Sequence, residues 1–143
     1  MWWEQYIGKP WENIPNPPHT FNCGELVRYI LKDRLGIDNP PIIADGDKLR
    51  ECIANLSVPE AYGLMPFEGD PRPFDIVYLM RRVRRDHIAL CVNSPQGLAF
   101  LHCVQGAGVV CETEFEMKCT TNSAFMEWRR HKDVTEEMVR CLA

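Results

Sequence analysis

The sequence predicts an α+β protein in which N-terminal helices pack on a central antiparallel β-sheet. Apolar residues near the N-terminus recur at helical spacing, whereas beyond residue 73 they form short runs separated by turns, as strands do. This order, helices first and a strand meander afterwards, is typical of the α+β class. The 143 residues match the length of one domain and contain no internal repeat or linker. We therefore expect a single domain over residues 1–143.

The N-terminal part predicts two helices. A short opening helix over Trp2 to Ile7 precedes a proline-rich extended loop. Cys23 to Leu35 follows as an amphipathic helix. The residues expected on its apolar face are Leu26, Val27, Ile30 and Leu31, and those expected to face away are Glu25, Arg28, Lys32 and Asp33. Asn22 is a suitable N-cap with Glu25 in capping-box position, and Gly36 a suitable end.

The remaining elements are predicted from shorter patterns. Asp45 to Leu56 is a second, shorter helix, and residues 57–73 are predicted to form a loop because they hold four prolines and two glycines. Strands are expected over residues 74–80, 87–92, 98–104, 108–111 and 125–129. A closing helix capped by Thr135 is expected to run to Leu142.

Composition and charge exclude several classes of function. Hydrophobic residues make up 45% and charged residues 25%, as in a soluble globular protein, and the net charge of -4 argues against a general nucleic-acid binder. The run Arg81 to Arg85 is interpreted as a solvated hairpin tip, or alternatively as an anchor for an acidic wall peptide or polymer. No apolar run spans a bilayer, and Met1 to Gln5 does not start a signal peptide. We expect no membrane or nucleic-acid partner, and a cytoplasmic location on synthesis.

One of the seven cysteines differs in position from the others. Their odd number, with no Cys-x-x-Cys pair, makes a disulfide framework or zinc knuckle improbable, so most should be small buried residues. Cys23 lies at the first position of a predicted helix, where free N–H groups and the helix dipole favour an anion. We expect a lowered thiol pKa there, a sulfur that faces the sheet, and N–H groups able to donate to an oxyanion. The alternative is a buried structural cysteine.

Two histidines flank a predicted hairpin and could serve that thiol. A four-residue loop centred between Ser94 and Pro95 pairs Val92 with Gly97, and extending this register outward places His87 directly opposite His102. A thiol nucleophile needs a base and the base needs an orienting partner, so His87 and His102 fit these two roles. A structural histidine pair is one alternative. A Cys-His-His metal site is another, but no fourth ligand is evident, so we predict no metal and no cofactor. His19 and His131 receive no role.

These motifs together resemble the NlpC/P60 family of cysteine peptidases. The corresponding stretches are Tyr6-Ile7-Gly8-Lys9-Pro10-Trp11, Asn22-Cys23-Gly24-Glu25-Leu26-Val27, Pro73-Phe74-Asp75-Ile76-Val77, His87-Ile88-Ala89-Leu90-Cys91 and Leu101-His102. The resemblance runs from Tyr6 to about Trp128 and keeps the order Cys, His, His. It departs from the family pattern at Asn22, where Asp is usual, and at Gly24-Glu25, where Ser-Gly is usual.

The resemblance implies a papain-like fold and hydrolysis of peptidoglycan stem peptides. Cys23 would attack an amide carbonyl, His87 would act as base and His102 would orient it, with Tyr6, Trp11 and Asn22 on the substrate side. The front end looks most like phage tail-tip assembly proteins, which implies a phage or prophage context, tail-protein partners and association with the virion. The departures leave two alternatives open. One is a catalytically inactive structural or assembly protein, and the other is a thiol amidase or acyltransferase acting on a non-wall substrate.

Overall fold

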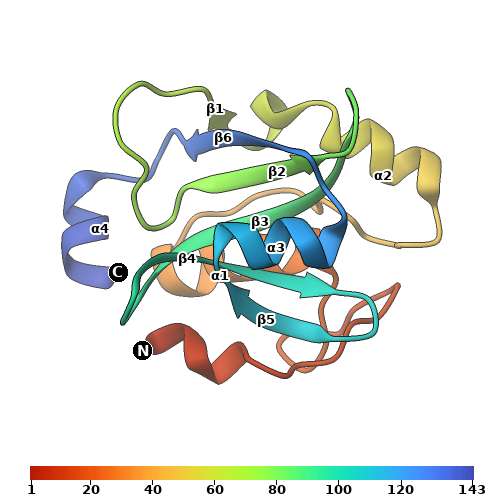
Figure 1. The fold of residues 1–143 in the computed structure, drawn as a ribbon, viewed down its shortest axis with the longest axis horizontal. Helices are drawn as coiled ribbons and strands as arrows, with labels where there is room; N and C mark the ends of the chain where they lie inside the picture. Colours follow the sequence, from red (N-terminus) through yellow and green to blue (C-terminus); the bar gives the residue numbers. More distant parts are fainter.

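Six strands form one antiparallel sheet, with helices on both of its faces (Figure 1). The structure, a computed structural model, describes all 143 residues. The strands are β1 (Leu64–Met65), β2 (Ile76–Met80), β3 (Arg85–Ser94), β4 (Gly97–Val104), β5 (Gly108–Glu112) and β6 (Phe125–His131). Their order across the sheet is β1-β6-β2-β3-β4-β5. The predicted meander therefore holds for β2 to β5, whereas β6 returns to the other side of β2.

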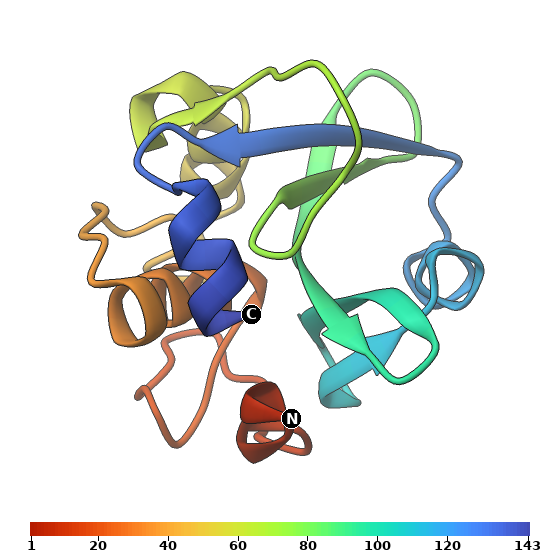
Figure 2. The ribbon, with the colours of Figure 1, turned by 90° about the vertical axis from the view of Figure 1, so that its left-hand side faces the viewer.

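The α-helices divide unequally between the two faces. They are α1 (Cys23–Leu35), α2 (Leu49–Leu56), α3 (Glu114–Thr121) and α4 (Glu136–Leu142), and short 3₁₀ turns cover Trp2–Tyr6 and Pro59–Tyr62. Figure 2 shows α1, α2 and α4 on one side of the sheet and α3 alone on the other. The predicted α+β class, with N-terminal helices on a central antiparallel sheet, is confirmed.

Both faces of the sheet are buried, which explains why its central strands read as continuous apolar runs. Successive side chains of β3 alternate between two clusters. Ile88 and Leu90 join the large core beneath α1, while Ala89 and Cys91 join a smaller cluster with Met117 of α3. Because His87 has the same parity as Ala89 and Cys91, its side chain starts on the face that α3 covers.

Helix α1 has the predicted bounds and caps. Asn22 Oδ1 accepts a hydrogen bond from the Glu25 amide at 2.9 Å, and Gly36 ends the helix in the left-handed conformation with φ 70°. The expectation that Glu25 faces away from the core is wrong. Its side chain is buried, pairs with Arg28 at 3.1 Å and accepts from the Ile42 amide at 3.4 Å, so it fastens the loop after α1 to the helix.

Three other predictions about elements need correction. Helix α2 begins at Leu49 and not at Asp45, because residues 45–48 form a turn in which Asp45 Oδ1 accepts from the Asp47 amide. The predicted loop of residues 57–73 contains a 3₁₀ turn and strand β1. Helix α3 was not expected at all.

Each edge of the sheet is partly covered. At one edge β1 contributes only two residues, which pair with Arg130 and His131 of β6. At the other, the N-terminal segment lies against β5, where the Gly8 amide donates to Val109 O and the Val109 amide donates to Lys9 O, both at 2.9 Å. Gly108 permits this approach, since a Cβ there would lie 2.4 Å from Lys9 O. The same segment then carries Trp11 towards the start of α1 through a bridge to Phe21.

Candidate active site

Cys23 lies at the start of α1 in a pocket of about 230 Å³. The pocket walls come from the N-terminal segment, α1, α2, β3 and β4. Its polar and sulfur-bearing lining residues are Asn22, Cys23, Cys52, Asp86, His87, Cys103 and Gln105, and its other walls include Trp11, Ile43 and Val104. Of the six residues predicted for the site, this pocket brings together Cys23, His87, Trp11 and Asn22.

The close fit of the chain around Cys23 explains one departure from the family pattern. Asn22 Nδ2 donates to Ile43 O at 2.8 Å, which fastens residues 42–43 beside the first turn of α1. A Cβ on Gly24 would lie 2.9 Å from Ile42 Cγ2. The close approach of Ile42 therefore requires glycine at position 24. The departure from the family pattern at this position has a packing cause and gives no information about the substrate.

Asn22 and Tyr6 are held by contacts of their own. The Asn22 side chain is 1% exposed, and its oxygen and nitrogen are both engaged by the chain, so it positions Cys23 more than it offers groups to a ligand. Tyr6 is not among the pocket residues. It is buried in the core, and its hydroxyl donates to Asp33 Oδ2 at 2.8 Å. The predicted substrate-side position of Tyr6 is corrected accordingly.

His87 and His102 contact each other, as predicted, but by a different register. His87 Nε2 and His102 Nδ1 are 2.9 Å apart, and the rings meet edge to face. The hairpin has a two-residue loop, so Ser94 pairs with Gly97, and the β3–β4 ladder ends at Leu90 and Leu101. This register differs from the predicted one by two residues. Because side chains alternate with period two, the error leaves both histidines on the same face.

Glu112 extends this contact into a three-residue chain that sequence reasoning missed. His102 Nε2 lies 2.7 Å from Glu112 Oε1, and Thr120 Oγ1 donates to the other carboxylate oxygen at 2.7 Å. Strand β5 positions the carboxylate, because His102 pairs with Val110 and Glu112 is two residues further along the same face. The glycine turn before β5 could have predicted that His102 pairs with Val110. The two-residue spacing from Val110 to Glu112 would then have placed the carboxylate on the same face as His102.

The hydrogen bonds fix the tautomers of both rings. A carboxylate has no proton to donate, so His102 Nε2 carries the proton and His102 Nδ1 is the acceptor. His87 Nε2 must then be the donor, which leaves His87 Nδ1 as an unprotonated nitrogen with no partner in the chain. This assignment holds for neutral rings. Burial lowers the pKa of His87 to about 3, helped by His102, and burial also lowers the pKa of His102, although Glu112 opposes that shift.

The expectation of a lowered thiol pKa at Cys23 is wrong. Burial raises its pKa to about 12, and backbone hydrogen bonding from Ile88 and Gly24 opposes this shift without cancelling it. The thiol is 8% exposed, so the cost of desolvating a thiolate exceeds the benefit of the helix N-terminus. No hydrogen bond joins Cys23 to His87. The resting pocket therefore holds a neutral thiol and a neutral imidazole.

The first turn of α1 also supplies donors. The N–H groups of Cys23 and Gly24 donate to no backbone or side-chain oxygen, as expected for the first residues of a helix, and both lie against the Cys23 sulfur. Such groups can stabilise negative charge on an oxygen beside the sulfur. A buried thiol, an imidazole with one free nitrogen and N–H groups beside the sulfur are together the parts needed for nucleophilic attack on a carbonyl.

Neither a metal-binding cluster nor a membrane-spanning helix is found in the chain. No group of three or more His, Cys, Asp or Glu side chains has the geometry to hold a metal ion. None of the helices is both long and apolar enough to cross a bilayer. His19 is exposed in the proline-rich loop.

Comparison with solved structures identifies the architecture. The NlpC/P60 domain of the peptidoglycan hydrolase SagA superposes with a TM-score of 0.57 at 18% identity, over 89% of this chain and 90% of that one. This chain has the NlpC/P60 fold. A Staphylococcus aureus protein described as similar to lipoprotein, NLP/P60 family, gives a TM-score of 0.54 at 15% identity over 89% of this chain. This chain spans 38% of that longer protein.

The amino-acid sequence alone does not assign the chain to a family. No protein-family model matches the chain, and no curated protein is detectably similar to it. The expectation of a papain-like NlpC/P60 fold is confirmed by the solved structures. At these levels of identity the likeness establishes the fold, while the chemistry must be argued from the residues of this chain.

Proposed function

We propose that this chain is a cysteine amidohydrolase acting on peptidoglycan stem peptides. The observation that carries the proposal is the shared pocket of Cys23 and His87, with His87 held by His102 and Glu112 so that its one free nitrogen is unprotonated. The fold supports the substrate class, since one solved structure that shares it is the domain of a peptidoglycan hydrolase.

The proposed reaction proceeds through a thioester. Cys23 Sγ attacks the amide carbonyl while its proton passes to His87 Nδ1, and the N–H groups of Cys23 and Gly24 stabilise the oxyanion. The C–N bond breaks, and the imidazolium returns the proton to the leaving amine. Water, activated by the same nitrogen, then hydrolyses the thioester and restores the thiol. Because thiol and imidazole are both neutral at rest, proton transfer accompanies attack and does not precede it.

His102 and Glu112 act through His87 as positioning residues. The carboxylate maintains the His102 tautomer, and His102 in turn maintains the His87 tautomer that can accept the thiol proton. The carboxylate also stabilises the positive charge that develops on the imidazole pair during attack. Neither residue needs to contact the substrate.

The test is cleavage of purified stem peptides, followed by mass spectrometry. Wild type is expected to release the two halves of the peptide, and Cys23→Ala is expected to release none. Cys91→Ala is a matched control, because Cys91 is also buried but belongs to the cluster beneath α3, away from the pocket. No product from wild type, or equal product from Cys23→Ala, would rule out the proposal.

A second candidate, favoured by the raised pKa of Cys23, is a structural or assembly protein with an inactive site. It predicts a thiol that reacts no faster than the other buried cysteines. Iodoacetamide labelling followed by peptide mapping separates the two candidates. Faster alkylation of Cys23 than of Cys91, lost in His87→Ala, supports the hydrolase, whereas equal slow labelling supports the structural role.

A further inference from the structure

A second hollow adjoins the Cys23 pocket and shares His87 with it. It has a volume of about 350 Å³ and is lined by Arg81, Arg84, Asp86, His87, Thr120 and Thr121, with Val104. Asp86, His87 and Val104 also line the Cys23 pocket, so the two hollows meet at the imidazole. A ligand that reaches Cys23 can therefore extend past His87 into this second hollow, which we call the arginine groove.

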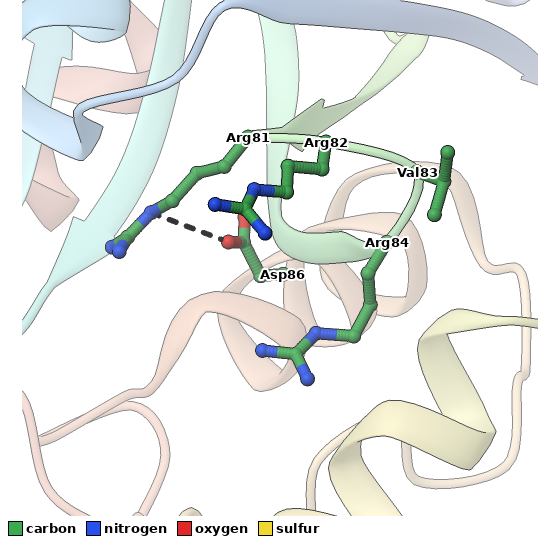
Figure 3. Close-up of a pocket in the computed structure, with 5 residues that line it drawn as sticks. All are labelled: Arg81, Arg82, Val83, Arg84 and Asp86. Carbon is green, nitrogen blue, oxygen red and sulfur yellow. Dashed lines mark ion pairs between the residues drawn. The ribbon is translucent and has the colours of Figure 1, made fainter.

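The arginine groove is positively charged. The loop between β2 and β3 carries Arg81, Arg82 and Arg84, and Figure 3 shows their side chains on the side of Asp86 while Val83 points away. Arg82 and Arg84 have no ion-pair or hydrogen-bond partner in the chain. Arg81 has only Asp86, at 3.5 Å. In the arginine groove one carboxylate thus accompanies two guanidinium groups, and Arg82 lines a neighbouring hollow formed by the same loop. This concentration of positive charge occurs in a chain whose net charge is -4.

The neighbouring Arg85, in contrast, has an ion-pair partner within the chain. Its guanidinium makes a two-pronged ion pair with Glu127 and is half-buried. Arg81 and Arg84 have no such partner in β6, so their donors remain available to a bound anion. Guanidinium groups bind planar carboxylates through paired N–H donors, which makes a carboxylate the anion that best fits an exposed pair of arginines.

The position of His87 assigns the arginine groove to one half of the substrate. In the proposed reaction His87 returns its proton to the leaving amine, so that amine must lie against the imidazole. The acyl half remains bound to Cys23 at the start of α1. The amine half must therefore lie beyond His87, where the arginine groove begins.

We propose that the amine half of the substrate carries a carboxylate, which Arg81 and Arg84 bind. This inference rests on the proposed function and adds a specificity to it. The arginine loop selects amides whose leaving residue is anionic, and it does so by contacts outside the reacting atoms. The alternative interpretation, a solvated hairpin tip, predicts no dependence on the charge of the leaving residue.

The experiment compares two peptides that differ in one charge. Both carry the same acyl half, and the leaving residue ends in a free carboxylate in one and in a carboxamide in the other. Wild type is expected to cleave the carboxylate peptide with a kcat/KM about tenfold higher. In the double variant Arg81→Gln/Arg84→Gln the preference is expected to disappear. In Arg140→Gln, which removes an exposed arginine of α4, it is expected to persist.

Salt gives a second check on the same preference. The arginine groove is open to solvent, so screening should reduce the preference as ionic strength rises from about 0.05 to about 0.5 M. Equal kcat/KM for the two peptides in wild type would overturn the inference. A preference that survives the double substitution would also overturn it.

Binding to an inactive variant separates this inference from the proposed function. Cys23→Ala is titrated with each peptide by calorimetry. If wild type cleaves neither peptide but Cys23→Ala binds the carboxylate form more tightly, the hydrolase proposal fails and the anion site stands. If cleavage occurs and binding is equal, the hydrolase stands and the anion site fails. Absence of binding by both peptides overturns the anion site.

Discussion

The protein holds three of its four histidines at two sites, one at His131 and one at the His87–His102 pair. The two sites have similar environments, but only the second lies beside a thiol. His131 is 2% exposed; its Nε2 lies 3.3 Å from Asn39 Oδ1, and its Nδ1 accepts from the Asp133 amide at 3.1 Å. At the other site His102 is equally buried and both of its nitrogens are engaged. His87, however, has one nitrogen engaged and one free. Burial lowers the pKa at all three residues.

The comparison shows that burial and a lowered pKa do not mark a catalytic histidine. His131 fills a gap beside Gly63 and satisfies its own polar neighbours, so its role is structural. His87 differs in two respects that can be tested: one of its nitrogens has no partner in the chain, and the residue lines a pocket that also contains a thiol.

Removing each imidazole in turn should separate activity from stability. His87→Ala is expected to reduce kcat by about 10²- to 10⁴-fold, because the thiol loses its base, and also to lower Tm, because the buried His102 Nδ1 loses its donor. His131→Ala is expected to lower the free energy of unfolding by about 1–3 kcal/mol, because buried polar groups lose their partners, and to leave kcat unchanged. Peptide hydrolysis and urea unfolding measure the two effects. Loss of activity in folded His131→Ala would contradict the distinction.

Glu112→Gln tests whether the carboxylate acts through the histidines. Loss of its charge should reduce kcat by about 10- to 100-fold, since the imidazolium formed during attack is less well stabilised. KM should stay within error of wild type, because Glu112 does not line the Cys23 pocket. Glu116→Gln is the matched control, because Glu116 caps α3 from the surface and lies outside the histidine chain. A rise in KM with unchanged kcat would place Glu112 in substrate binding.

Gly63→Ala tests how tightly the His131 ring is packed, because Gly63 lies against that ring. Gly63 has φ 73°, and a Cβ there would lie 2.8 Å from His131 Nε2. Backbone strain and displacement of the ring should lower the free energy of unfolding by about 1–3 kcal/mol. Gly36→Ala has a similar positive φ but open space around it, so it reports the backbone contribution alone. Equal losses in the two variants would show that the His131 ring gives way without cost.

Acid should destabilise both sites in the same direction. His87, His102 and His131 all have folded-state pKa values below the 6.5 of a free imidazole, so the unfolded chain binds more protons between that pH and the folded values. The free energy of unfolding should therefore fall as pH decreases from 7 to 5. Urea unfolding across this range measures the slope, which should be smaller in His131→Ala. A flat profile would contradict the lowered pKa values.

The helix and strand regions of this fold differed in how far the sequence could predict them. Helix α1 was predicted to the residue, because Asn22, its apolar stripe and Gly36 are local signals that agree. The β3–β4 register was displaced by two residues, since a two-residue and a four-residue loop are both compatible with Asn93 to Gly97. The predicted histidine contact survived because the displacement was even.

Other features depended on tertiary contacts that a single sequence does not contain. Burial of Glu25 requires the loop at Ile42, which no local pattern indicates. The pKa of Cys23 depended on how deeply the pocket buries it, and the helix position alone suggested the wrong sign. Helix α3, in contrast, had a local signal: Thr113 and Glu116 form a capping box that the sequence displays.

The N-terminal segment that lies against β5 limits how two copies of this molecule can associate through their sheets. An exposed edge strand offers unpaired backbone groups to a neighbouring chain, which can lengthen the sheet from one copy to the next. Here the N-terminal segment occupies the donor and the acceptor of β5 at Val109. A strand of another copy could pair at Val109 only after residues 8–9 detach, so the attachment of these residues protects this part of the sheet against strand-mediated aggregation.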